Sequence, residues 1–320
     1  MAGRSPPLFS EFTVMNTVRI KSYAKINLTL EIVGERDGYH LLDSLVSSVD
    51  MSDLIVLKKR KDKLSSITMH GLGSESIPPE TNNALKASEA FSRKFGVNGA
   101  DITVYKNIPM GAGLGGSSAD ASGVLLGMAK LYGVTDVNGI EELADRLGSD
   151  TRYMLTGGFA RMQGRGTELT SLPIFEKLYF LALFPKSSVS SGACYKEYDR
   201  LKTDYTTGES TLACIEALQK KDLNGVGRYL TNALYLPSAN LNSDVKTAYE
   251  EALSFSPLGV VMTGSGSCVL ALFETKELCE WAKSRYRGKC KSAVVATCLP
   301  EKMRKTIKNP FVLNADGEEE

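Results

Sequence analysis

A glycine-rich segment in the first half of the chain constrains its fold and function more than any other feature. The run Pro109–Asp120 reads PMGAGLGGSSAD, with four glycines and two adjacent serines. Glycines let a backbone pass close to a bulky anion and reach dihedral angles that other residues avoid. Small residues follow, so a helix beginning at Ser117 or Ser118 can turn its unpaired N–H groups and positive dipole end toward the loop. The segment therefore predicts a phosphate-binding loop.

Two widespread phosphate-binding loops do not match this segment. A Walker loop has Lys-Ser or Lys-Thr after its last glycine, and neither pair occurs here. The dinucleotide fingerprint has a different glycine spacing and an acidic residue at the end of the next strand. The alternative is a purely structural glycine turn capped by serine. The density of glycines and the paired serines before a small-residue helix favour the phosphate loop.

Strand and helix patterns alternate through both halves of the chain. Apolar and polar residues alternate over Arg19–Ile32, Arg36-Asp37-Gly38 marks a turn, and a strand returns through Leu41–Val49. Helical periodicity covers Asn83–Phe95 and ends at Gly96. Further strands are predicted near residues 54–57, 67–69, 102–104, 159–169 (a hairpin), 178–184, 260–273 and 292–298, and further helices from the glycine loop to 132, at 140–147 and at 276–286. This mixture indicates an α+β or α/β protein.

The length of 320 residues is sufficient for two domains. We place the boundary at Leu172-Pro173. Residues 1–16 read as a disordered extension, 17–172 as an N-terminal domain, 173–300 as a C-terminal domain and 301–320 as a tail.

Composition argues against several classes of protein. A formal net charge of +1 gives no indication of a nucleic-acid or membrane partner. No apolar run approaches the length of a membrane span, and the N-terminus lacks the apolar core of a signal peptide. The six cysteines form no C-x-x-C pair, and there are only two histidines, so a zinc site is not expected. Reduced cysteines packed as small apolar residues fit a cytoplasmic location.

Three motifs in order resemble those of the GHMP kinases, a superfamily that includes galactokinase, homoserine kinase and mevalonate kinase. The glycine-rich segment resembles their central motif, Ala24–Leu28 (AKINL) their N-terminal strand motif, and Met262–Ser267 (MTGSGS) their C-terminal glycine motif. The resemblance spans nearly the whole chain. It implies an α+β, two-domain GHMP kinase fold with an S5-like N-terminal domain and a ferredoxin-like C-terminal domain. It also implies ATP and Mg²⁺ as cofactors, bound in the cleft between the domains.

Shorter segments resemble one branch of that superfamily, the diphosphocytidyl-methylerythritol kinases of the non-mevalonate isoprenoid pathway. These segments are Arg36–His40 (RDGYH), Ser48–Asp50 and Gly148–Asp150. The resemblance implies ATP-dependent phosphorylation of the 2-hydroxyl of 4-diphosphocytidyl-2-C-methyl-D-erythritol, a cytidine diphosphate-linked polyol. Three features depart from the branch: the proline usual before Asp37 is missing, Ser117 stands where a third glycine is common, and Thr151–Tyr153 stands where Val-Pro-Phe is usual.

Two rival functions stay open on the sequence. One is another GHMP small-molecule kinase, for mevalonate, homoserine or a sugar, against which the Gly-Tyr-His segment argues. The other is a GHMP-fold binding module without catalysis, against which the joint retention of Lys25, the glycine loop and Asp150 argues. The expected partner is a small-molecule substrate, with no nucleic acid and no membrane, and the chain is expected to be a monomer or a homodimer.

The resemblance assigns catalysis to Asp150 and Lys25. Asp150 would orient or deprotonate the substrate hydroxyl, and Lys25 would neutralise charge nearby, because phosphoryl transfer depends mainly on positioning and charge stabilisation. From the residues alone, Asp150 reads as a helix N-cap and Lys25 as a solvated strand lysine.

For ATP, the resemblance implies that Asn83 and Lys106 contact the base, with a helix cap and a surface lysine as the alternatives. Ser118 is the implied Mg²⁺ ligand. The residues expected around the nucleotide phosphates are Pro109, Gly111, Gly113, Leu114, Gly115, Gly116, Ser117 and Ser118.

For the second substrate, Tyr39 and His40 are expected to recognise cytosine by stacking and hydrogen bonding, with Tyr195 as a second stacking aromatic. The alternatives are a histidine that braces its own hairpin and a core tyrosine on an amphipathic helix. Arg165, between two glycines, reads as a solvated turn residue rather than a phosphate ligand. The substrate site is completed by Gly264, Ser265 and Gly266.

Overall fold

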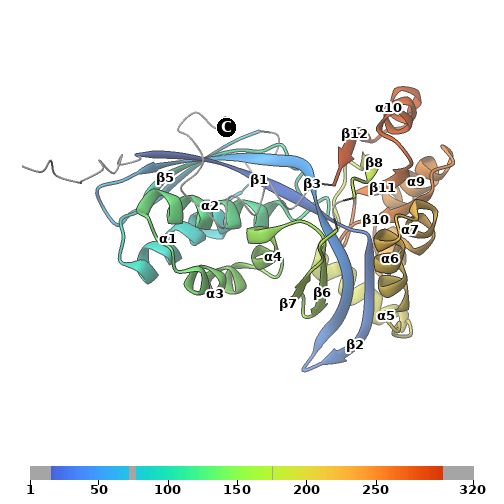
Figure 1. The fold of residues 1–320 in the computed structure, drawn as a ribbon, viewed down its shortest axis with the longest axis horizontal. Helices are drawn as coiled ribbons and strands as arrows, with labels where there is room; N and C mark the ends of the chain where they lie inside the picture. Colours follow the sequence, from blue (N-terminus) through green and yellow to red (C-terminus); the bar gives the residue numbers. More distant parts are fainter. Residues whose placement is uncertain (1–15, 72–76, 175, 298–320) are drawn as a thin grey trace, which may run out of the picture.

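Two sheets lie along the long axis of an elongated molecule (Figure 1). The computed structural model describes residues 16–71, 77–174 and 176–297. The first sheet has eight strands: β1 (Thr17–Asn27), β2 (Thr29–Arg36), β3 (Tyr39–Lys59), β4 (Ser66–His70), β5 (Ala100–Tyr105), β6 (Ala160–Gly164), β7 (Glu168–Ser171) and β9 (Thr231–Asn232). The second has four: β8 (Tyr179–Phe184), β10 (Gly259–Met262), β11 (Val269–Phe273) and β12 (Lys291–Ala296).

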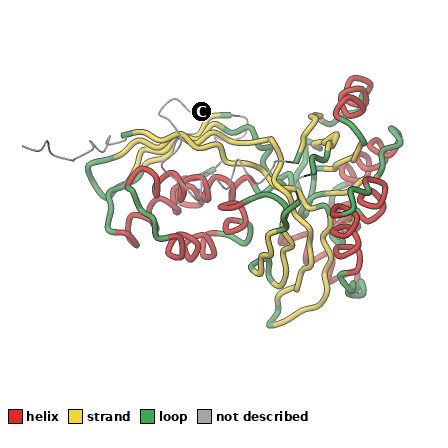
Figure 2. The backbone as a smooth tube through the Cα atoms, viewed as in Figure 1, coloured by secondary structure: helices red, strands yellow, loops and turns green. Residues whose placement is uncertain are grey.

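Helices cover the first sheet on one face, where Figure 2 shows them in red beneath the yellow strands. They are α1 (Asn83–Phe95), α2 (Gly116–Tyr132), α3 (Val137–Leu147) and α4 (Thr151–Thr156), preceded by a short 3₁₀ turn at Pro79–Thr81. Those of the second half are α5 (Ser191–Leu201), α6 (Glu209–Gln219), α7 (Leu223–Tyr229), α8 (Tyr235–Leu241), α9 (Ser243–Leu253) and α10 (Lys276–Arg285). Among the described residues, no helix is both long and apolar enough to cross a membrane.

Strand β3 holds the first sheet together. It runs for 21 residues, a length of about 70 Å at the usual rise per residue. Its first half pairs with β2 and β6, and its second half pairs with β1 and β5, all antiparallel. The sequence pattern predicted two strands here, at 41–49 and 54–57. They form a single strand because the change of partners occurs along a continuous ladder.

The helical layer is packed closely against the sheet because its central helix carries small residues. Gly123 and Gly127 of α2 face the side chains of Ile55 and Leu57 on β3, and no Cβ would fit there without displacing them. Fully buried Val124 and other apolar residues of α2 join the same core. The stretch after the glycine loop is therefore buried nearly all round, which places the start of α2 in a fixed position.

The second half of the chain forms its own antiparallel sheet but also contributes to the first. The order of the second sheet is β10-β11-β8-β12. Strand β9 pairs with β2 in parallel, and Val49 bridges to Thr297. Ile26 and Leu28 of the first half share a core with Phe180 and Leu270 of the second. The prediction of an α+β, two-domain fold is confirmed, and the two halves are joined by a continuous apolar core.

Most other predicted elements occur in the structure, with two further differences. The predicted strand over residues 19–32 is divided into β1 and β2 at Leu28, whose backbone N–H donates to Leu45 of β3. Helix α2 begins at Gly116, one residue before the predicted start, because Gly115 adopts the left-handed conformation at its N-cap. The predicted N-terminal extension (apart from Asn16) and the C-terminal tail lie outside the described residues.

Two glycine loops meet where the halves of the molecule join. Gly113 (φ +77°) and Gly264 (φ +57°) both adopt the left-handed conformation, and each lies against the other's loop. A Cβ on Gly113 would overlap the carbonyl oxygen of Thr263, and one on Gly264 would lie 2.8 Å from the carbonyl oxygen of Gly113. The N–H of Cys268 donates to the Ala112 carbonyl across this junction at 3.2 Å. Only glycine allows so close an approach.

We predict that Gly113→Ala destabilises the protein by more than Gly133→Ala, as measured by urea denaturation. Both glycines have a positive φ, so both substitutions carry a strain of about 1–2 kcal/mol. Gly133 has open space around it, whereas Gly113 faces backbone, so Gly113→Ala adds a collision that cannot relax by rotating a side chain. Equal losses of stability in the two variants would show that the loops do not need this close approach.

Candidate active site

Two cavities adjoin each other at the junction of the sheets. The first has a volume of about 420 Å³ and is bounded by the glycine loop, the start of α1 and Lys106. The second has a volume of about 550 Å³ and is bounded by the β2–β3 hairpin, the β6–β7 turn and α5. Residues that line both cavities are Lys25, Asp150, Ser191, Gly264 and Ser265. The two residues predicted to be catalytic therefore lie at the boundary between the cavities.

Lys25 and Asp150 face each other across this boundary. The Nζ atom of Lys25 lies 3.4 Å from Oδ2 of Asp150, and the lysine side chain is only 6% exposed. The burial rules out the solvated strand lysine that the residues alone suggested. A register shift between Tyr23 and Lys25 in the β1–β3 ladder marks a bulge, which redirects side chains locally. The backbone N–H of Lys25 donates to Leu114 and ties this bulge to the glycine loop.

Asp150 occupies the N-cap position of α4 but does not cap the helix. Its side chain accepts no capping hydrogen bond, and its backbone already has helical angles (φ −91°, ψ −10°). A capping side chain would turn back toward the helix N–H groups. The Asp150 carboxylate is directed instead to Lys25. The structure therefore favours the functional interpretation over a simple N-cap.

Asn27 is a residue of this site that sequence reasoning did not select. Its Oδ1 accepts hydrogen bonds from Lys25 Nζ (2.7 Å) and from the N–H of Gly264 (3.0 Å). Its Nδ2 donates to Ser44 Oγ at 2.8 Å, and its backbone N–H donates to Thr263 Oγ1 at 2.9 Å. Its position two residues after Lys25 in an alternating strand placed both side chains on one face. Its partner Gly264, 237 positions away, could not be predicted from the sequence.

The glycine loop supplies the wall of the first cavity. All the residues predicted to surround the phosphates line it, from Pro109 to Ser118. The start of α2 opens on the same space, so its unpaired N–H groups and positive dipole end face the cavity. Asn83 Nδ2 donates to Ser117 Oγ at 3.1 Å, which links α1 to the loop. The helix cap suggested for Asn83 is Asn82 instead, whose side chain accepts from Ala84. The proposed base contact of Asn83 stays a prediction.

Lys106 is buried beneath the loop and shared by two carboxylates. Its Nζ donates to Asp120 Oδ2 at 2.7 Å and also to Asp53 Oδ2. The other oxygen of Asp53 accepts the N–H groups of Asn107 (2.6 Å) and Ile108 (2.8 Å), which fixes the backbone leading into the glycine loop. Lys106 is thus neither a surface lysine nor free to move, and its predicted contact with the nucleotide base stays a prediction.

This cluster holds one more acidic group than basic groups. Oδ1 of Asp120 is buried without a hydrogen-bond partner. Burial, and then the Asp53 carboxylate, raise the pKa of Asp120 to about 7 against the opposing effect of the Lys106 ammonium. A carboxyl group whose pKa is higher in the folded than in the unfolded protein favours folding at low pH. It loses that contribution as the pH rises from about 4 to 7.

We predict that two substitutions in this cluster have different effects on the free energy of unfolding. Lys106→Met leaves two buried carboxylates unpaired and should lower the free energy of unfolding at pH 7.5 by about 3–5 kcal/mol. Asp120→Asn leaves a one-to-one pair, and its stability relative to wild type should improve as the pH rises from about 4 to 8. Urea denaturation across this pH range measures both effects. A pH-independent difference between Asp120→Asn and wild type would contradict the shared-charge description.

Aromatic side chains gather around His40 at the second cavity. The His40 and Tyr195 rings stack with centroids 5.0 Å apart, and Tyr198 meets His40 edge-on at 5.6 Å. His40 Nε2 lies 2.7 Å from Asp199 Oδ1. Burial, and the nearby charge of Asp150, raise the pKa of Tyr195. His40 therefore connects the β2–β3 hairpin to α5 rather than bracing its own hairpin, and Tyr39 beside it is half exposed.

The C-terminal glycine motif borders both cavities. Gly264 and Ser265 line both cavities, and Gly266 lines the first. Ser265 Oγ lies 2.8 Å from Ser191 Oγ at the start of α5. That Gly264, Ser265 and Gly266 bind the substrate stays a prediction. The motif does contact the glycine loop and Asn27.

Among residues 16–71, 77–174 and 176–297, no group of three or more His, Cys, Asp or Glu side chains is placed to hold a metal ion. The cysteines among residues 16–297 are free thiols, and burial raises the pKa of Cys194 to about 11 and of Cys214 to about 12. Such thiols are unreactive near neutral pH. Cys298 lies outside the described residues.

Comparison with known proteins identifies the family. The family model for the GHMP kinases N terminal domain matches residues 82–160, and that for GHMP kinases C terminal matches residues 214–290. The fold is that of a GHMP kinase, and the chain belongs to that superfamily.

Individual relatives narrow the assignment. A 4-diphosphocytidyl-2-C-methyl-D-erythritol kinase from Carboxydothermus hydrogenoformans is 36% identical over 256 residues, which is 78% of this chain and 86% of the relative. One from Caldicellulosiruptor saccharolyticus is 33% identical over 93% of this chain and 99% of its own length. A crystal structure of 4-(cytidine 5'-diphospho)-2C-methyl-D-erythritol kinase superposes with a TM-score of 0.73 at 26% identity, covering 88% of this chain and all of that chain. This chain belongs to the 4-diphosphocytidyl-2-C-methyl-D-erythritol kinase family.

Proposed function

We propose that this chain transfers the γ-phosphoryl group of ATP to the 2-hydroxyl of 4-diphosphocytidyl-2-C-methyl-D-erythritol. The observation that carries the proposal is the boundary between the cavities, where Lys25 and Asp150 line both. A phosphate held by the glycine loop and a hydroxyl group entering from the second cavity would meet at this pair. The family to which the chain belongs supports the identity of both substrates.

Asp150 and Lys25 would divide the chemistry between them. The Asp150 carboxylate would accept a hydrogen bond from the substrate hydroxyl and then its proton as the bond to phosphorus forms. The transition state of phosphoryl transfer is loose, so correct orientation matters more than basic strength. Lys25, held by Asn27 at 2.7 Å, would place its ammonium group against the negative charge of the transferred phosphoryl.

The residues of the first cavity also fit Mg²⁺, which would supply charge neutralisation between the β- and γ-phosphates. Mg²⁺ prefers oxygen ligands and usually takes only one or two from the protein, the rest being phosphate oxygens and water. The hydroxyl of Ser118 lines the cavity beside the loop and is such a donor. The absence of a three-ligand metal cluster in the described residues is compatible with a metal that arrives with the nucleotide.

Fold alone would not select this substrate. Homoserine kinase from Cytophaga hutchinsonii superposes with a TM-score of 0.71 at 18% identity, covering 92% of this chain and 98% of that chain. The L. major mevalonate kinase also reaches a TM-score of 0.71, at 14% identity, covering 89% of this chain and 98% of that chain. An ADP-release assay should therefore compare the cytidylyl compound with mevalonate, homoserine and unsubstituted methylerythritol phosphate. Turnover confined to one of the last three would overturn the proposal.

Asp150→Asn should lower kcat by about 10²–10⁴-fold while leaving the protein folded. The amide keeps the shape of the carboxylate but cannot take the proton, and no capping hydrogen bond is lost because Asp150 makes none. Steady-state kinetics and thermal denaturation measure the two effects. Asp145→Asn, which removes a surface carboxylate paired with Arg152, is the matched control and should keep wild-type turnover. A kcat within a few-fold of wild type for Asp150→Asn would refute its catalytic role.

His40→Ala should raise KM for the cytidylyl substrate by about tenfold and leave KM for ATP unchanged. The imidazole lines the second cavity only, and loss of one hydrogen bond with stacking is worth about one factor of ten. His70→Ala is the control, because His70 also stacks on a tyrosine but lies on β4, and it should not change KM for that substrate. A lower melting temperature with unchanged KM would assign His40 to bracing α5 alone.

A further inference from the structure

Arg165 stands at the tip of the β6–β7 turn, between two glycines with positive φ. Its guanidinium carbon lies 3.5 Å from the centroid of the Tyr39 ring. The residue is exposed, as the sequence indicated, yet it is not a freely moving turn side chain. Stacking on an aromatic face restricts a planar guanidinium to one orientation, with its N–H groups around the rim free to donate.

The turn brings Arg165 into the lining of the second cavity, together with the aromatic residues Tyr39, His40 and Tyr195. Gly166 and Ser149 line the same cavity, and a Cβ on Gly166 would lie 3.8 Å from Cβ of Ser149, the neighbour of Asp150. The turn therefore reaches from Tyr39, on which the guanidinium lies, toward the residue next to Asp150.

Arg165 brings to this cavity a positive charge that no carboxylate of the described residues pairs with. The acidic residues lining it are Asp150 and Asp199, and these face Lys25 and His40. Within the described part of the chain, Arg165 and Lys196 of α5 line the cavity without an ion pair to any carboxylate. Lys196 has a flexible stem, whereas Arg165 is held on Tyr39. The oriented cation is the one suited to recognise an anion with two or more oxygen acceptors.

We propose that Arg165 binds the diphosphate of the second substrate and sets the preference for a nucleoside diphosphate over the bare nucleoside. The inference rests on the proposed function. In the cytidylyl substrate the diphosphate lies between the cytidine and the methylerythritol, which matches a turn that reaches from Tyr39 toward the neighbour of Asp150. The guanidinium rim would donate N–H groups to phosphate oxygens while its face stays on Tyr39.

The test is a calorimetric titration with CDP, CMP and cytidine, with the first cavity saturated by ADP. The proteins are wild type, Arg165→Gln, Arg165→Lys and Arg146→Gln. Arg146 is 72% exposed on α3 and lines neither cavity, so its variant controls for the loss of one positive charge. Because Arg165 lies in an exposed turn, its variants should fold, and their melting temperatures verify this.

Wild type should bind CDP more tightly than cytidine. Arg165→Gln should weaken CDP binding about tenfold, the value of one charge-assisted hydrogen bond, and leave cytidine unchanged. The CDP affinity of Arg165→Lys should fall between those of wild type and Arg165→Gln, because lysine keeps the charge but loses the planar fork. KM for the full substrate should follow CDP affinity while KM for ATP stays constant.

Three results would overturn the inference. Wild-type CDP affinity in Arg165→Gln would show that the guanidinium does not bind the diphosphate, and the proposed function would stand. Equal tightening of CDP and cytidine in that variant would show that Arg165 merely occupies the face of Tyr39. Binding of neither CDP nor cytidine by wild type would remove the proposed function together with the inference.

Discussion

The rest of the site depends on the close approach of the two glycine loops and on the carboxamide of Asn27, which bonds to the second loop. Gly113 and Gly264 come together without side chains, and Asn27 bonds to both Lys25 and the Gly264 N–H. The first loop forms the wall of one cavity, and the second loop lies against both. A displacement at this junction would separate the glycine loop from Lys25. The proposed phosphoryl transfer depends on such alignment, so it would require this junction to keep its geometry.

Buried charge is distributed around this junction in two unlike groups. At the boundary, Lys25 faces Asp150 at 3.4 Å, and both residues line the two cavities. Beneath the glycine loop, Lys106 is paired with both Asp53 and Asp120. This second group supports the loop, because Asp53 also fixes the backbone entering it. The two buried lysines therefore differ in their partners, and only Lys25 is proposed to act in catalysis.

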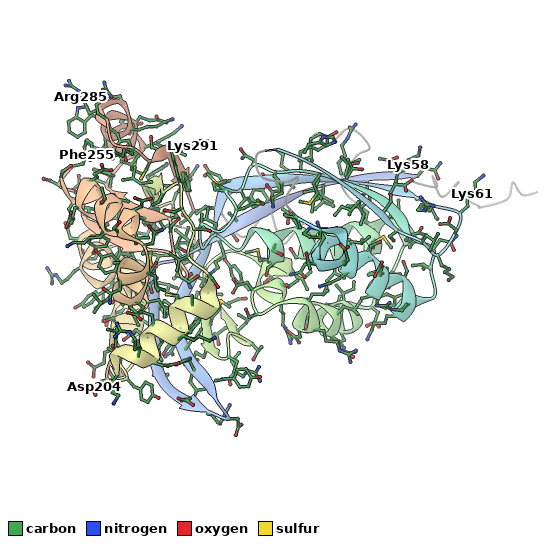
Figure 3. All side chains as sticks on the ribbon, turned by 180° about the vertical axis from the view of Figure 1, so that it is seen from behind. Lys58, Lys61, Asp204, Phe255, Arg285 and Lys291 are labelled. Atoms are coloured by element: carbon green, nitrogen blue, oxygen red, sulfur yellow. The ribbon has the colours of Figure 1, made fainter. Side chains whose placement is uncertain are left out.

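The elements that shape the second cavity are attached to the fold at its edges. The β2–β3 hairpin projects away from the helix-covered part of the sheet, and Figure 3 shows it alongside α5, far from Lys58 and Lys61 at the opposite end of β3. His40 joins this hairpin to α5, and Arg165 joins it to the β6–β7 turn. Homoserine and mevalonate kinases share the fold at low identity. The hairpin, the β6–β7 turn and α5 line the second cavity, where we propose that the second substrate binds.

The sequence determined the phosphate loop, the order of most strands and helices, and the two catalytic candidates by resemblance. Glycine density, the period of apolar residues and stop signals such as Gly96 and Gly133 are local properties, so they could be read without coordinates. The sequence could not determine which distant residues would contact one another. Asn27 bonding to Gly264, Lys106 buried between Asp53 and Asp120, and Arg165 stacked on Tyr39 all join segments far apart in the chain. Only the tertiary structure settles such contacts, because they depend on how β3 aligns its partner strands and on the close packing that glycine permits.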